Sequence, residues 1–123
     1  MTRKILFVLF AEDGCRQAHA LWYAMDLHRQ GHQVRLILEG AATQMLARLD
    51  DSGFEMGAAV REAQAAGVLA GACFRASIGC GCDAESSRAV EAARVHGIAL
   101  LADRDGHAAI GPFVADGYEL VVI

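Results

Sequence analysis

Three of the four cysteines of this chain lie between residues 73 and 82. Cys73 ends a short apolar run, and Cys80 and Cys82 alternate with glycines in the segment that follows. A thiolate is both a nucleophile and a soft metal ligand, and a position next to a helix N-terminus favours the ionised form. Cys82 directly precedes Asp83, a residue type that caps helices. The residue types and their spacing therefore indicate a sulfur-centred site.

Two residues elsewhere in the chain are candidates for the same site. His107 follows a glycine in a turn, and Cys15 opens a predicted helix. Ligands of an open parallel sheet bind beyond the carboxyl ends of its strands, and Cys15, the cysteine segment and His107 each follow a predicted strand. We therefore expect them at one edge of the sheet, with His107 as a proton partner. The alternatives are an inert, packed Cys15, a buried apolar Cys73 and a solvent-exposed His107.

Three kinds of chemistry could use these residues. In the first, a thiolate accepts a sulfane sulfur as a persulfide and passes it to another thiol. In the second, the three clustered cysteines and His107 bind zinc, although their spacing is uncommon for a zinc knuckle. In the third, residues 79–84 match the nucleotide-binding pattern G-x-G-x-x-A, although residues 75–78 separate it from the preceding strand. The chain contains no Walker A sequence.

The hydrophobic pattern predicts the elements that must position these residues. Continuous apolar runs indicate strands covered on both faces, and apolar residues three and four apart indicate helices between them. Strands are expected at 4–10, 33–39, 68–73, 98–102 and 118–123, and helices at 14–30, 41–49, 54–66, 84–96 and 110–115. Their alternation predicts one α/β domain over residues 1–123, a three-layer α/β/α arrangement around a five-stranded, mainly parallel sheet.

Three local details of this arrangement also follow from the sequence. Asp13 is expected to cap the first helix, and Asp83 is expected to cap the helix over 84–96. The residues expected on the core-facing side of the first helix are Ala18, Leu21, Trp22 and Met25. Arg35 interrupts the second apolar run, which suggests that this strand lies nearer an edge of the sheet than the first.

Composition argues against several classes of function. The formal net charge is −4, and the basic residues form no stripe of the kind that binds nucleic acid. The longest apolar run, residues 5–11, is too short to span a bilayer, and residues 1–4 lead into a strand rather than a signal peptide. Four cysteines without an export signal indicate thiols in a reducing cytoplasm. Only 21% of the residues are charged, which favours a homo-oligomer that covers apolar surface.

In the order and spacing of its motifs, the chain resembles the DsrE/DsrF-like family of small sulfur-relay proteins, which includes the Tus subunits of tRNA thiolation. The similarity extends over nearly the whole length. It includes Gly-His-Gln-Val at 31–34 before the second strand and Gly-Ala-Cys at 71–73 at the end of the third. It also includes Asp-Gly-His at 105–107 before a short helix and Gly-Tyr at 117–118 at the last strand.

This resemblance implies a DsrE-like fold in which Cys73 carries a persulfide. It also implies sulfur donor and acceptor proteins as partners, and trimers or hexamers with the reactive loop near a subunit interface. We expect Cys82 and Cys80 to assist or resolve the persulfide and His107 to assist proton transfer. The expected function is that of a cytoplasmic sulfur carrier of the sulfurtransferase type, without a cofactor, a membrane or direct contact with nucleic acid. The alternative is a metal- or small-ligand-binding module, or a structural subunit, that uses the same loop without sulfur transfer.

Overall fold

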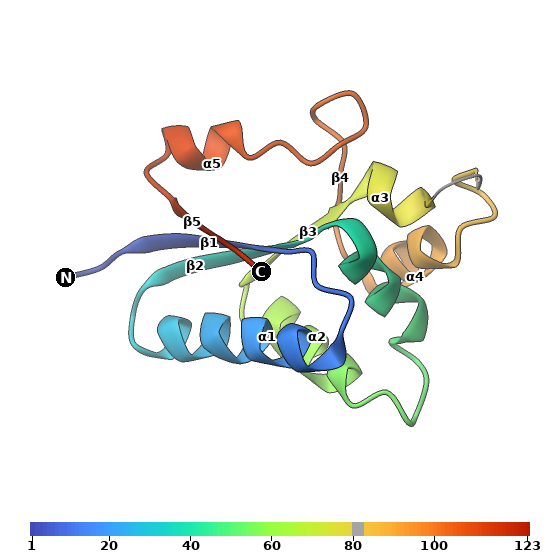
Figure 1. Cartoon of the computed structure of the whole chain (residues 1–123), viewed down its shortest axis with the longest axis horizontal. Helices are drawn as coiled ribbons and strands as arrows, with labels where there is room; N and C mark the ends of the chain where they lie inside the picture. The colour runs from blue at the N-terminus through green and yellow to red at the C-terminus, as the bar shows by residue number, and fades with distance from the viewer. Residues whose placement is uncertain (80–82) are drawn as a thin grey trace.

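The structure is a computed structural model that describes residues 1–79 and 83–123. Strands and helices alternate along most of the chain, as the hydrophobic pattern predicts (Figure 1). The elements are β1 (Lys4–Leu9), α1 (Gly14–Arg29), β2 (Gln33–Leu38), the 3₁₀ helix η1 (Gly40–Arg48), α2 (Met56–Ala65), β3 (Leu69–Cys73), α3 (Phe74–Ile78), α4 (Arg88–His96), β4 (Leu100–Leu101), α5 (Gly111–Ala115) and β5 (Glu119–Val122).

The five strands form one sheet in the order β4-β3-β2-β1-β5. Every neighbouring pair is parallel, so the carboxyl ends of all the strands lie at the same edge. The predicted five-stranded parallel sheet in a single α/β/α arrangement is therefore confirmed. The register between β2 and β3 shifts after the pair Leu36–Leu69 and continues with Ile37–Gly71 and Leu38–Ala72.

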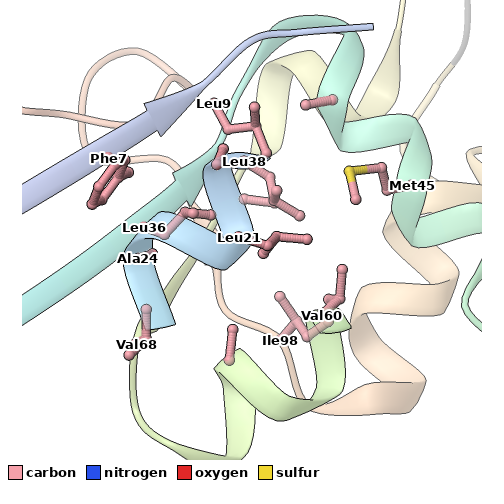
Figure 2. Close-up of a cluster of buried hydrophobic side chains, with 14 of the residues drawn as sticks. Phe7, Leu9, Leu21, Ala24, Leu36, Leu38, Met45, Val60, Val68 and Ile98 are labelled. Atoms are coloured by element: carbon pink, nitrogen blue, oxygen red, sulfur yellow. The ribbon is translucent and has the colours of Figure 1, made fainter. Parts of the chain in front are cut away.

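The two faces of the sheet are covered unequally. Helices α1, α2 and α4 and the 3₁₀ helix η1 contribute to a large hydrophobic core on one face, which Figure 2 shows with Leu21, Val60 and Met45 packed against Leu36 and Leu38. The other face buries a small cluster that α5 and the segment before it cover through Phe113 and Ala108. This thin layer lies over the carboxyl end of β3.

The first helix begins as predicted, but its buried face is shifted by about one residue. Asp13 caps α1 by accepting a hydrogen bond from the Arg16 N–H at 3.2 Å. The buried residues of α1 are Gln17, Ala20, Leu21, Ala24 and Met25. Trp22 is 62% exposed, so its predicted place in the core is wrong. Gln17 is buried instead. Its side-chain amide donates a hydrogen bond to the Ala11 carbonyl at 2.9 Å, so the buried polar group has a partner.

The helix after the cysteine segment begins later than predicted. Its cap is Ser87, whose hydroxyl accepts a hydrogen bond from the Val90 N–H at 3.2 Å and donates to the Ser77 carbonyl at 2.6 Å. Asp83 instead accepts from the Ser86 N–H at 2.8 Å in a turn before the helix. The prediction that Asp83 caps this helix is therefore wrong. Ser87 is the better cap because its second hydrogen bond ties the helix start to α3.

The expectation from Arg35 that the second strand lies nearer an edge of the sheet than the first is wrong. Strand β2 lies in the middle of the sheet, between β3 and β1. Arg35 follows the same alternation as Ile37 and lies half-buried on the thinly covered face, and its Nε has no hydrogen-bond partner among the described residues. Strand β4 is also shorter than predicted, and α3, which follows Cys73 directly, replaces part of the expected loop.

Candidate functional site

Cys73 is the last residue of β3, at the carboxyl edge of the sheet, and α3 begins with the next residue (Figure 1). Its side chain is 0% exposed. Gly71, two residues before Cys73, allows β4 to approach β3 closely. A Cβ at Gly71 would lie 2.5 Å from the Ala99 carbonyl oxygen, and its φ of +153° disfavours other residues. The end of β3 that carries the thiol is thus packed closely against β4, where Cys73 pairs with Leu101.

The strand register places two further side chains beside the thiol. Leu38 pairs with Ala72 and Cys73 pairs with Leu101, so Glu39, one residue beyond β2, falls next to Cys73. Side chains of a strand alternate between its faces. Leu38 and Ala72 lie in the large core, and Leu101 packs in the small cluster. Glu39 and Cys73 therefore lie on the thinly covered face.

His107 reaches the thiol from a tight turn after β4. Arg104 and His107 exchange backbone hydrogen bonds of 2.9 and 2.8 Å across this turn. The two central residues, Asp105 and Gly106, have φ of +53° and +86°, which is the geometry of a type I′ turn and explains the Asp-Gly pair. The turn brings the Nδ1 of His107 to 3.9 Å from the Sγ of Cys73. The predicted pairing of these two residues is therefore present, although the rest of the His107 side chain is exposed.

The surroundings of Cys73 act on its pKa in opposite directions. Burial raises the pKa of the thiol above its ordinary value, because the thiolate would lose its hydration. The backbone N–H groups of Ala76 and Ala108 oppose this increase, and the latter points at the Sγ from 3.5 Å. The Glu39 carboxylate raises the pKa further by accepting a hydrogen bond from the thiol and by its negative charge. The net direction is upward, so the resting group is a neutral thiol.

Glu39 is a residue that sequence reasoning did not single out. Its carboxylate also accepts a hydrogen bond from the Gly40 N–H at 3.0 Å, where η1 begins. Gly40 and Ala76 line a shallow open groove between η1 and α3 next to the site. The sequence does show that Glu39 directly follows the apolar strand β2. It does not show that β2 lies next to β3, which carries Cys73, because this depends on the strand order of the sheet.

The other candidate residues have different outcomes. Cys80 and Cys82 lie outside the residues that the structure describes, and so does half of the nucleotide-binding pattern at 79–84, namely residues 80–82. Cys15 is exposed at the start of α1, and its Sγ lies 3.6 Å from the Nδ1 of His19 rather than near Cys73. In residues 1–79 and 83–123, no three His, Cys, Asp or Glu side chains are grouped to hold a metal ion.

Comparison of the chain with protein-family models, curated proteins and solved structures found no match. Within the described part of the chain, none of the helices has the length and apolar character needed to cross a membrane. The arrangement of Cys73, Glu39 and His107 must therefore be interpreted from its own chemistry. It is a buried thiol with two N–H donors, a carboxylate on one side and an imidazole on the other.

Proposed function

We propose that this chain is a sulfur carrier, in which Cys73 accepts a sulfane sulfur as a persulfide and passes it to an acceptor thiol. The observation that carries the proposal is the contact between the Cys73 thiol and His107 at the carboxyl edge of a parallel sheet. The Ala76 and Ala108 N–H groups support it because they stabilise the thiolate that must form during transfer. The resemblance to the DsrE/DsrF-like family points to the same residue.

The transfer is a thiol exchange without net oxidation. His107 takes the proton of Cys73, and the thiolate attacks the terminal sulfur of a donor hydropersulfide, R–S–SH. A new S–S bond forms to Cys73, and the old S–S bond breaks with its electron pair remaining on the donor sulfur. The donor thiolate then takes the proton from His107 and leaves as R–SH. Delivery of the sulfur to an acceptor thiol follows the same steps, with Cys73 as the leaving thiol.

The partners of such a carrier are a donor and an acceptor protein, and we propose that the chain itself forms a trimer or hexamer. The support for self-association is apolar surface at the edge strand β5, where Leu120 and Val122 are exposed. We place the protein in the cytoplasm, because Cys15 and Cys73 are free thiols, as expected in a reducing compartment.

A second candidate function is a structural or ligand-binding subunit without sulfur transfer. The observation that favours it is the complete burial of the Cys73 side chain, because a thiol without exposed surface often serves only as a small apolar core residue. In that case Glu39 and His107 would have no role in transfer. The two candidates differ in whether the folded chain takes up sulfur.

The test is intact-mass spectrometry after exposure to a sulfane-sulfur donor. The wild-type chain is compared with Cys73→Ser, Cys80→Ser and Cys82→Ser, and Cys15→Ser serves as the matched control. The proposal expects a gain of one sulfur that only Cys73→Ser abolishes. A gain of one sulfur that only Cys82→Ser abolishes would assign the transfer to Cys82 instead of Cys73. If no variant gains sulfur, the carrier function is refuted, and bound zinc in the same samples would indicate a metal-binding module.

A further inference from the structure

Residues 102–110 form a strap over the Cys73 thiol. This strap connects β4 to α5 on the thinly covered face of the sheet (Figure 1). Its Ala108 N–H lies 3.5 Å from the Sγ of Cys73, and the Nδ1 of its His107 lies 3.9 Å away. The Arg75 N–H of α3 donates to the Gly106 carbonyl of the strap at 2.9 Å. Within the described part of the chain, the strap therefore separates the thiol from solvent on the thinly covered face of the sheet.

The closed strap restricts the space for a second sulfur on Cys73. The thiol has no exposed surface, and Glu39, Leu101 and Ala76 of α3 lie next to it. A second sulfur would be bonded about 2 Å from the Sγ. Placed toward the strap, it would overlap the Ala108 backbone or the His107 ring. Close-packed interiors do not absorb an added atom of this size without a neighbour moving.

The strap is the neighbour that is most free to move. Asp103, Arg104 and Asp105 are exposed, and the turn between Arg104 and His107 closes on itself. Among the described residues, the middle of the strap has one backbone-to-backbone hydrogen bond to another element, the one from Arg75, and at its end the Ile110 carbonyl accepts bonds from the Phe113 and Val114 N–H groups of α5. The sheet beside the thiol, in contrast, is held by strand pairing on both sides of β3, at Ile37–Gly71 and Leu38–Ala72 with β2 and at Cys73–Leu101 with β4.

We propose that the strap senses the state of Cys73: a sulfur adduct on Cys73 opens it, and removal of the adduct lets it close. The inference rests on the proposed function in one respect, namely that the natural adduct is a persulfide. The empty and the loaded chain then present different surfaces around residues 102–110. A partner protein could thereby distinguish a carrier that holds sulfur from one that does not.

The experiment uses a stable adduct in place of the persulfide. In the full chain with Cys15→Ser, Cys80→Ser and Cys82→Ser, methyl methanethiosulfonate is allowed to react with Cys73. The thiolate attacks the sulfenyl sulfur, the Cys73–S–S–CH₃ disulfide forms, and methanesulfinate leaves with the electron pair of the broken S–S bond. Amide hydrogen exchange is then measured by nuclear magnetic resonance, before modification, after modification and after removal of the adduct with dithiothreitol.

The expected result is local and reversible. Exchange at the Arg75, Arg104 and His107 amides, which the closed turn protects, should become at least tenfold faster, while amides of β1 remain unchanged. Dithiothreitol should restore the original rates. As a second readout, trypsin should cleave after Arg104 faster in the modified chain. The matched control carries Cys73→Ala in addition, and the reagent should change nothing in it.

Three outcomes would overturn the inference. The first is full modification of Cys73 without faster exchange in the strap. The second is faster exchange throughout β1 and β2, which would mean general unfolding. The third is a folded chain in which the reagent never reaches Cys73. Failure of the sulfur carrier proposal would look different, because the strap would open with the methylthio adduct while the chain gained no sulfur from a sulfane-sulfur donor.

Discussion

At the scale of single residues, the chemistry of Cys73 depends on whether its proton is held or released. Burial and the Glu39 carboxylate favour the neutral thiol, and the Ala76 and Ala108 N–H groups favour the thiolate. Burial and Glu39 together outweigh the two N–H groups, so the pKa of the Cys73 thiol is raised. In the proposed sulfur transfer, a thiol at rest needs a base when it reacts, and we propose His107, whose Nδ1 lies 3.9 Å from the Sγ, for that role.

Replacing Glu39 with Gln should lower the pKa of the Cys73 thiol. The amide removes the negative charge that disfavours the thiolate, yet its oxygen can still accept the hydrogen bond from Gly40. At neutral pH, alkylation of Cys73 by iodoacetamide should become severalfold faster, because one pKa unit corresponds to a tenfold change in thiolate fraction. The measurement is the pH profile of alkylation in the chain without the other three cysteines. An unchanged profile would show that Glu39 does not act on the thiol.

The raised pKa of Cys73 also predicts how stability depends on pH. The folded chain binds the thiol proton more tightly than the unfolded chain, so stability is fully present below the ordinary thiol pKa of 9.0. Stability should fall as pH rises from this value through the higher pKa of the folded state. Urea unfolding between pH 7 and 10 should therefore show a loss that Cys73→Ala reduces. Equal slopes for both chains would contradict the assigned direction of the shift.

At the scale of elements, the connection between α3 and α4 depends on Ser87. Its hydroxyl caps α4 and bonds the Ser77 carbonyl, so it links the helix that follows Cys73 to the helix that packs beneath it. Loss of such a cap typically costs 0.5–2 kcal/mol. This linkage helps to fix α3, and with it the Ala76 N–H that faces the thiol.

Substitution of Ser87 by Ala should destabilise the chain by about 1–2 kcal/mol, because it removes the cap and leaves the buried Ser77 carbonyl without this donor. Asp83→Ala is the matched control, since Asp83 is exposed and its hydrogen bonds to described residues are made within the preceding turn, chiefly to Ser86. The measurement is urea denaturation followed by circular dichroism. If Asp83→Ala had the larger effect, the cap of α4 would have been assigned to the wrong residue.

At the scale of the whole molecule, the uneven covering of the sheet is the dominant feature. One face carries several helices over a large core, whereas the other carries α5 and the strap over residues 102–110. Edge strand β5 is exposed along its whole length. Edge strands with exposed apolar side chains are sites of association unless they are protected. The proposed homo-oligomer would cover this edge.

Two exposed valines offer a direct test of that proposal. Val122 on β5 is 63% exposed and Val95 on α4 is 68% exposed, so a charge should be tolerated equally well by the monomer at either position. If β5 lies in the interface, Val122→Lys should shift the chain to a smaller species in multi-angle light scattering, and Val95→Lys should not. A wild-type chain that is already monomeric at high concentration would refute self-association.

Part of this molecule follows from sequence alone because its determinants are local. Apolar runs predicted the strands, and the alternation of strands and helices predicted the parallel sheet. The Asp105-Gly106 sequence before His107 predicted a turn after β4. Cys73 and His107 could be placed at one edge because all parallel strands end on the same side of a sheet. These inferences need only the order of residues along the chain.

The tertiary structure alone decided which side chains meet at that edge. Glu39 lies beside Cys73 only because β2 neighbours β3, and Cys15 lies apart from it although it also follows a strand. The burial of the thiol was likewise decided by the fold, because the strap that covers it folds back from a later part of the chain. Local patterns specify elements through backbone and side-chain propensities, whereas the environment of a thiol depends on contacts between residues far apart in sequence.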